Sequence, residues 1–249
     1  MRRIVLTVEY DGTRYAGWQR QENAVTVQQL IEENLFKVTG ERCALQGSGR
    51  TDSGVHALGQ VAHFDTTARM DAARFAYALN TGLPEDIRVT ESREAPPGFH
   101  ARFSAKKKHY RYVVNNGPHA SALFGRYELH VHRPLDAAAM DLAAEALLGS
   151  HDFSAFKAVE CTLPDCVRTL LRSQVTRQGD RVFYDVVGTG FLYNMVRIIV
   201  GTLLEIGKGK RAPEEMAKIL ASGDRANAGP TAPAKGLTLV RVDYEGAAL

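Results

Sequence analysis

Residues 47–56 hold the side chains whose types and spacing best suit catalysis. The segment reads Gly-Ser-Gly-Arg-Thr-Asp-Ser-Gly-Val-His, with the guanidinium of Arg50 and the carboxylate of Asp52 among three glycines. In an extended stretch, residues two apart point to the same side, so Arg50 and Asp52 could pair and converge on one ligand. The glycines would let the backbone approach that ligand closely. Gly, Ser and Asp also suit an ordinary surface turn, so the segment alone indicates a candidate site and no more.

The carboxylate of Asp52 suits a nucleophile or a base. Asp has a reference pKa of about 4 and is ionised at neutral pH, and a neighbouring Arg50 would keep it ionised when substrate excludes water. A carboxylate-dependent hydrolase would need a second carboxylate across the substrate or a cluster of acidic metal ligands, and the motif has neither. The motif also lacks the Gly-Lys-Ser/Thr ending of a nucleotide-binding loop. A carboxylate-dependent hydrolase and a nucleotide-binding loop are therefore both disfavoured.

Cations and aromatic rings alternate in the segment Lys106-Lys107-Lys108-His109-Tyr110-Arg111-Tyr112. Phosphates favour the cations and unstacked bases favour the rings, so the mixture suits single-stranded or looped RNA better than duplex DNA. A solvated basic strand edge is the alternative. Arg197 lies in the apolar run of residues 195–200, where an unpaired charge is costly. It must therefore meet an anion or lie on the solvent side of a helix.

The composition is that of an ordinary globular protein. The chain has 249 residues, of which 45% are hydrophobic and 24% are charged, and its formal net charge of +3 permits an anionic partner. The most apolar stretch, residues 191–206, is interrupted by Asn194 and Arg197, so we expect no membrane span. The apolar run of residues 4–8 is short for a signal peptide, and we expect a cytoplasmic protein.

No residue pattern calls for a metal ion. The three cysteines, Cys43, Cys161 and Cys166, form no even set and lack the second ligand pair of a zinc site. His130 and His132 would share a strand face, but no third ligand matches them. We expect reduced structural thiols and no metal.

The first half of the chain predicts the element order β-α-β-β-α-β. Thr26 and Gln29 form a capping-box pattern before the first helix, and Gly40 follows its end. The expected strands are Arg3–Tyr10, Ala44–Ser48, Gln60–Thr66 and Ile87–Arg93, and the expected helices are Val27–Val38 and Ala72–Asn80. This is the order of a ferredoxin-like unit, which RNA-recognition domains also use.

The second half repeats this order with one extra helix. The expected strands are Lys107–Val114, Leu171–Arg177, Arg181–Val187 and Leu237–Tyr244, and the expected helices are Ala137–Leu148, Phe191–Ile206 and the additional Pro213–Ala221. We therefore predict an α+β fold of two pseudo-duplicated ferredoxin-like halves, residues 1–104 and 105–249, with mostly antiparallel sheets and helices on one face. Asp52 lies in the first half and Tyr110 on the first strand of the second, so we expect the active-site cleft between the halves.

Several further motifs follow one another in a fixed order along the chain. Residues 49–57 read Gly-Arg-Thr-Asp-Ser-Gly-Val-His-Ala, and Gln60 and His63 come next. The other motifs are residues 10–13, 15–21, 99–105, 110–112, 151–153 and 190–197. In sequence, order and spacing, this set resembles the tRNA pseudouridine synthase I (TruA) family, whose active-site pattern is Gly-Arg-Thr-Asp-Ala/Ser-Gly-Val-His-Ala.

The resemblance implies roles for four residues. Asp52 would be the nucleophile, Tyr110 would stack on the base and relay a proton, and Arg197 would orient Asp52. Arg50 would pair with Asp52 or take the place of a flipped nucleotide. Whether Asp52 attacks uracil C6, attacks ribose C1′ or acts as a base stays open, because a carboxylate can do all three. The candidate RNA contacts are Lys106, Lys107, Lys108, Arg111, Arg20 and His56.

The resemblance also implies the reaction and its substrate. Such an enzyme converts uridine to pseudouridine at positions 38, 39 and 40 of the tRNA anticodon stem-loop, and family members act as homodimers. The isomerisation is redox-neutral and adds no outside atoms, so we expect no cofactor. A non-catalytic RNA-binding protein with the same basic and aromatic surface is the alternative, and it would not need Asp52.

Overall fold

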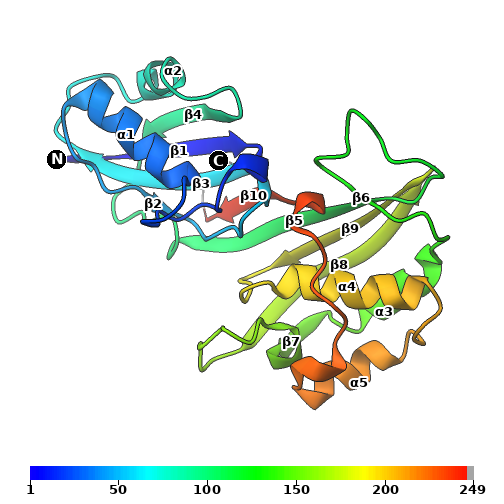
Figure 1. Ribbon diagram of the computed structural model, residues 1–249. Coiled ribbons are helices and arrows are strands. Elements are labelled where there is room, and N and C mark those ends of the chain that lie inside the picture. Colours follow the sequence, from blue (N-terminus) through cyan, green and yellow to red (C-terminus); the bar gives the residue numbers. More distant parts are fainter. Residues whose placement is uncertain (246–249) are drawn as a thin grey trace. The chain divides into compact units, whose positions relative to one another are not determined.

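Residues 1–245 are described by a computed structural model and divide into two α+β units (Figure 1). Among the described residues, the first unit comprises Met1–Lys106 and 239–245, and the second comprises Lys107–Thr238. The sequence predicts instead a boundary after residue 104, with the whole C-terminal part in the second half. The last strand, β10 (Leu237–Tyr244), corrects this division, because most of it belongs to the first unit, where it neighbours β3.

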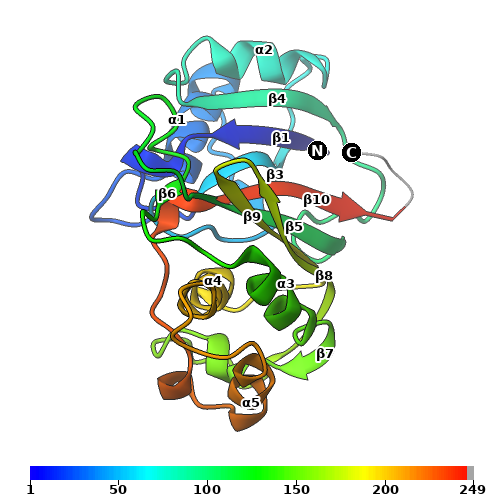
Figure 2. The same cartoon turned by 90° about the vertical axis from the view of Figure 1, so that its right-hand side faces the viewer.

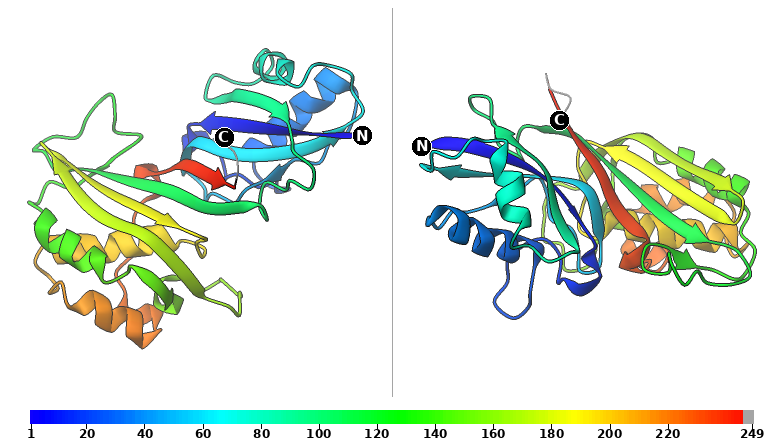
Figure 3. Two further views of the ribbon diagram at one scale, coloured as in Figure 1. Left: turned by 180° about the vertical axis from the view of Figure 1, so that it is seen from behind. Right: turned by 90° about the horizontal axis from the view of Figure 1, so that it is seen from above.

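The first unit has the predicted element order. Its remaining strands and its helices are β1 (Arg2–Tyr10), α1 (Val27–Thr39), β2 (Gln46–Gly47), β3 (His56–Thr66), α2 (Arg74–Asn80) and β4 (Ile87–Glu94). Strand β1 lies between β3 and β4 and is antiparallel to both, and β2 pairs with β3. The two helices lie on one face of this sheet (Figure 2 and Figure 3). Strand β2 is shorter than predicted and β3 begins four residues earlier.

Helix α1 begins at the predicted residue and ends at Thr39, one residue later than predicted. The Thr26 side chain accepts the Gln29 N–H at 3.4 Å, and Gly40 ends the helix in the left-handed conformation, with φ of 73°. Ile31 and Leu35 are fully buried on one side of the helix, and they form part of the core with Phe64 of β3 and Phe75 of α2. This core supports the sheet edge from which residues 48–55 extend.

The second unit is a sheet covered by helices. Its strands are β5 (Ala105–Asn115), β6 (Leu129–His130), β7 (Gly149–Asp152), β8 (Val167–Gln178) and β9 (Arg181–Gly188), and its helices are α3 (Ala137–Glu145), α4 (Met195–Gly207) and α5 (Glu215–Ser222). The strand order is β5-β9-β8-β7 with antiparallel pairing, while β6 pairs in parallel with β5. Helix α3 packs on both β8 and α4. The short strands β6 and β7 were not predicted.

Four helix boundaries differ from the prediction by two residues or more. Helix α2 begins at Arg74 and not at Ala72. Helix α4 begins at Met195 and not at Phe191, because Asn194 has a left-handed backbone (φ 60°) that cannot continue an α-helix. Helix α5 begins at Glu215, two residues after Pro213. Helix α3 has the predicted Asp136 cap, whose side chain accepts the Ala139 N–H at 2.9 Å, but it already ends at Glu145.

Residues 1–245 contain neither a candidate membrane-spanning helix nor a candidate metal-binding cluster. None of the helices there is long and apolar enough to cross a membrane. Nor does this part of the chain bring together three or more His, Cys, Asp or Glu side chains in an arrangement that could hold a metal ion.

Candidate functional site

Asp52 lies in the connection between β2 and β3, residues 48–55, which we call the Asp52 loop. The Asp52 side chain is half-buried, and the Val55 N–H donates to the Asp52 carbonyl oxygen at 3.1 Å, which closes a turn. The chain therefore turns directly after Asp52, between residues 52 and 55.

Arg50 lies in the same loop, and its side chain is exposed. Both of its expected roles, pairing with Asp52 and taking the place of a flipped nucleotide, stay predictions.

Two glycines from an earlier segment lie against the backbone of the Asp52 loop. A Cβ atom on Gly12 would lie 2.0 Å from the Val55 carbonyl oxygen, and one on Gly17 would lie 2.5 Å from the Thr51 carbonyl oxygen. Gly17 also has a φ of +88°, which side chains rarely adopt. The Trp18 N–H donates to the Thr51 carbonyl oxygen at 3.1 Å. Only glycine at positions 12 and 17 lets these backbones meet.

Buried side chains hold the loop from the other side. The hydroxyls of Tyr10 and Thr51 share a hydrogen bond of 2.7 Å, and both residues are buried. Gln60 on β3 accepts from the Ser48 hydroxyl at 2.6 Å and donates to the Gly49 carbonyl oxygen at 2.9 Å. Burial raises the pKa of Tyr10, so its hydroxyl stays neutral. The Asp52 loop thus has fixed contacts on both sides of the carboxylate.

His56 has a structural place in this arrangement. It is 4% exposed, and its Nδ1 accepts the Gly12 N–H at 3.1 Å. The same Nδ1 lies 3.1 Å from Asp11 Oδ1, which in turn accepts the Thr13 N–H at 2.9 Å. This position joins the start of β3 to residues 11–13, and RNA contact by His56 stays a prediction.

Tyr110 and Arg197 belong to the second unit. Tyr110 on β5 is 8% exposed, and its ring meets Phe191 edge-on, with centroids 5.1 Å apart and planes at 82°. Arg197 lies in the first turn of α4, where its Nε donates to the Ala232 carbonyl oxygen at 2.7 Å and its Nη1 to Asn194 Oδ1 at 2.8 Å. The charge in this apolar helix therefore meets fixed acceptors. Its pairing with Asp52 stays a prediction.

The candidate RNA contacts differ in how firmly they are held. Arg20 forms an ion pair with Glu32 at 3.1 Å, and Lys106 forms one with Glu245 at 3.1 Å. Arg111 donates to both oxygens of the buried Asp185, at 2.9 and 3.1 Å. Lys107 and Lys108 lie on the same strand, β5.

Asp185 is a charged group beneath the predicted basic surface that the sequence did not single out. It is 2% exposed and is bonded to His109 at 2.6 Å as well as to Arg111. Burial disfavours its charged form, but the hydrogen bonds from His109 and Arg111 outweigh burial and lower the pKa of Asp185. Asp185 therefore stays ionised and holds the Arg111 guanidinium in one direction.

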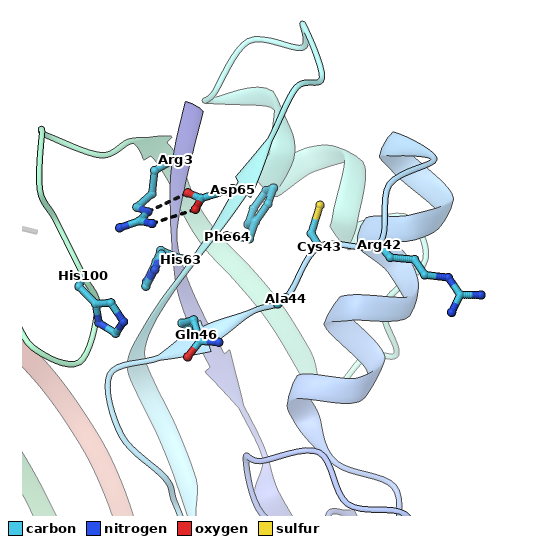
Figure 4. A pocket seen from close by; sticks show the side chains of 9 residues that line it. All are labelled: Arg3, Arg42, Cys43, Ala44, Gln46, His63, Phe64, Asp65 and His100. Atoms are coloured by element: carbon cyan, nitrogen blue, oxygen red, sulfur yellow. Dashed lines mark hydrogen bonds and ion pairs between the residues drawn. The ribbon is translucent and has the colours of Figure 1, made fainter. Parts of the chain in front are cut away.

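A separate cavity of about 290 Å³ opens in the first unit beside β2 and β3 (Figure 4). Arg3 and Asp65 form a two-point ion pair in its wall, with both N–O distances 2.8 Å. His63 also lines it and is 3% exposed, and its Nδ1 accepts the Ala101 N–H at 3.1 Å. Burial, together with the nearby Arg3 charge, lowers the pKa of His63 to about 4.

We expect His63 to make the protein less stable at acid pH. A fall in pKa from 6.5 to about 4 means that the unfolded chain binds a proton that the folded chain does not, so the stabilisation is complete above pH 6.5 and is lost as pH falls toward 4. The expected loss in unfolding free energy from this group is about 3 kcal/mol. Urea unfolding between pH 7 and pH 4 measures it.

The matched variant is His63→Asn, which keeps an acceptor for the Ala101 N–H and cannot titrate. It should lose less unfolding free energy than the wild type over the same pH range. An equal loss in both proteins would show that His63 does not titrate in this way.

The chain is similar to known proteins along most of its length. A family model described as tRNA pseudouridine synthase matches residues 6–104 and 143–245. A protein of Acetivibrio thermocellus named tRNA pseudouridine synthase A is 50% identical over 244 residues, 98% of this chain and 100% of that protein. Proteins of the same name from Brevibacillus brevis and Halalkalibacterium halodurans are 49% and 51% identical, over 98% and 95% of this chain and 100% and 90% of their own. A crystal structure of the archaeal box H/ACA sRNP Nop10–Cbf5 complex matches at 10% identity, covering 90% of this chain and 60% of that chain, with a TM-score of 0.37.

Proposed function

Because this chain belongs to the tRNA pseudouridine synthase family, we propose that Asp52 is the group with which it isomerises uridine in the tRNA anticodon stem-loop. The chain is an isomerase that converts uridine in tRNA to pseudouridine. This reaction breaks the bond from ribose C1′ to uracil N1 and joins C1′ to C5, so every atom of the nucleoside is kept. The protein must supply a nucleophile or base, a surface for the detached uracil and a path for the proton.

The proposal rests on the contacts that hold the Asp52 loop in one conformation. Two glycines, a buried Tyr10–Thr51 hydrogen bond and both ends of the Gln60 amide hold the backbone on either side of one carboxylate. A surface turn needs no such support. Holding a reactive group in one geometry before substrate arrives is how a protein lowers the entropy cost of a reaction.

Three further residues complete the proposed machinery. Tyr110 stacks on the extruded uracil and relays a proton, since a flat ring with a hydroxyl suits both tasks. Arg197 orients the Asp52 carboxylate, and the fixed direction of its guanidinium supports this role. Arg50 is exposed and has the planar group needed to fill the space that a flipped nucleotide leaves.

The tRNA is held through its backbone and shape in this proposal. The expected targets, positions 38, 39 and 40, lie at different places on one arm, so no single base sequence can define them. The candidate contacts on the tRNA are Lys106, Lys107, Lys108, Arg111, Arg20 and His56. The Arg111 guanidinium, which Asp185 holds, offers fixed donors to a phosphate.

We also assign a homodimer and a cytoplasmic location to the protein. Both follow from the family resemblance and from the place where tRNA is processed. Light scattering of the purified protein tests the dimer, for which the mass should be twice that of one chain.

Mapping the product tests the function. The purified protein is incubated with an unmodified tRNA transcript, and pseudouridine is located by chemical labelling. We expect product at positions 38 to 40 where those positions are uridines. Product only outside the anticodon arm would contradict the proposed target. No product on any tRNA would favour the non-catalytic RNA-binding alternative, which the full-length likeness to named synthases disfavours.

A further inference from the structure

Asn194 has an unusual backbone for its residue type. Among residues 1–245 it is the one residue other than glycine with a positive φ, at 60°. The left-handed conformation is unfavourable for a residue with a side chain, although Asn tolerates it better than most. Asn194 directly precedes α4, at the position where an Asn side chain ordinarily accepts an N–H of the first helical turn. A compensating interaction is therefore expected elsewhere.

The Asn194 side chain does not cap the helix. It makes no capping hydrogen bond, and its Oδ1 instead accepts Nη1 of Arg197 at 2.8 Å. Because Asn194 has a left-handed backbone, the helix begins at the next residue, Met195, and Arg197 lies within its first turn. The Asn194 side chain thus accepts a hydrogen bond from the Arg197 guanidinium and not from an N–H group of the first helical turn.

A second acceptor holds the same guanidinium from a different segment. Arg197 Nε donates to the Ala232 carbonyl oxygen at 2.7 Å, and the Ala232 N–H donates back to the Arg197 carbonyl oxygen at 3.0 Å. The segment before Ala232 lies tightly on α4, because a Cβ on Gly201 would lie 1.6 Å from the Pro230 carbonyl oxygen. Two rigid acceptors on two nitrogens fix both the plane and the rotation of a planar guanidinium.

We propose that Asn194 is a positioning residue for the isomerisation and that it acts by holding Arg197 in the orientation needed beside Asp52. This inference rests on the role of Arg197 under the proposed function. The amide suits the task because it is a neutral acceptor, which directs the guanidinium while leaving its full positive charge for the catalytic carboxylate. A carboxylate at position 194 would compete for that charge.

The variant Asn194→Gly tests the proposal. Gly adopts the same backbone without strain and removes only the acceptor. We expect kcat to fall about tenfold, the effect of losing one hydrogen bond to a charged group, while KM for tRNA and the melting temperature stay at wild-type values. The control is Thr231→Ala, an exposed position beside Ala232, which should keep the wild-type kcat. An Asn194→Gly variant with wild-type kcat would overturn the proposal.

A double-mutant cycle separates positioning from a structural role. If Asn194 acts through Arg197, then adding Asn194→Gly to Arg197→Ala causes no further fall in single-turnover rate. If the two changes lower the single-turnover rate by factors that multiply in the double variant, the proposal is contradicted, because Asn194 would then act independently of Arg197. If Arg197→Ala alone keeps the wild-type rate, the proposed role of Arg197 is what fails, and the cycle distinguishes the two outcomes.

Discussion

We expect Asp52→Asn to abolish pseudouridine formation while tRNA binding stays close to that of the wild type. Asn has nearly the same shape as Asp but carries no charge, so the backbone contacts of the Asp52 loop should remain while the nucleophile or base is lost. We expect the single-turnover rate to fall by at least about a thousandfold, as for other groups that take part directly in bond making. Product formation and filter binding with the same tRNA measure the two effects.

The matched control is Asp71→Asn, which removes a carboxylate from an exposed position of the same unit. Asp71 accepts the Ala73 N–H at 2.9 Å, and Asn keeps that acceptor. This variant should form pseudouridine at the wild-type rate. An Asp52→Asn protein within tenfold of the wild-type rate would remove Asp52 from the chemistry, since the amide can act neither as a nucleophile nor as a base.

Gly17→Ala should damage the reaction and the fold together. The new Cβ would lie 2.5 Å from the carbonyl oxygen of Thr51, the residue before Asp52, and the backbone would be held at a φ of +88°. The loop must move, and displacement of a reacting group by about 1 Å costs on the order of a hundredfold in rate. We also expect a loss of about 2 to 4 kcal/mol in unfolding free energy from strain and overpacking.

Gly40→Ala is the control for backbone strain alone. Gly40 has a φ of +73°, but a Cβ there meets no atom within 4 Å. This variant should lose about 1 kcal/mol of unfolding free energy and keep its full turnover rate. Urea unfolding and single-turnover assays of both variants give the comparison. If the two variants lose rate to the same extent, the contact between Gly17 and the Asp52 loop has no catalytic importance.

Much of the architecture could be predicted because it depends on neighbours along the chain. The Thr26 cap and the Gly40 terminus of α1 lie within one segment of the sequence, and both were confirmed. The β-α-β-β-α-β order of the first unit follows from periodicity in the same way. Strand β10 was also predicted at its correct residues, but its unit was not, because strand pairing joins residues far apart in sequence.

The candidate site was only partly predictable. The motif around Asp52 indicated which carboxylate to examine, and the likeness of motifs indicated the chemistry. What the spacing of Arg50 and Asp52 could not predict is that contacts with the segment around Gly12 and Gly17 hold the Asp52 loop in place. Helical periodicity placed the start of α4 too early, since an apolar pattern does not show the left-handed backbone of Asn194.

Residue types and their order thus established which groups can react, which segments are strands or helices, and to which family the chain belongs. Tertiary structure decided what holds the Asp52 loop, where α4 begins and which donors of Arg197 are already occupied. The physical reason is the distance along the sequence over which each kind of interaction acts. Periodicity, caps and turn residues act within a few positions, whereas the conformation of a loop is set by close backbone approach and buried hydrogen bonds between residues about forty positions apart, such as Tyr10 and Thr51.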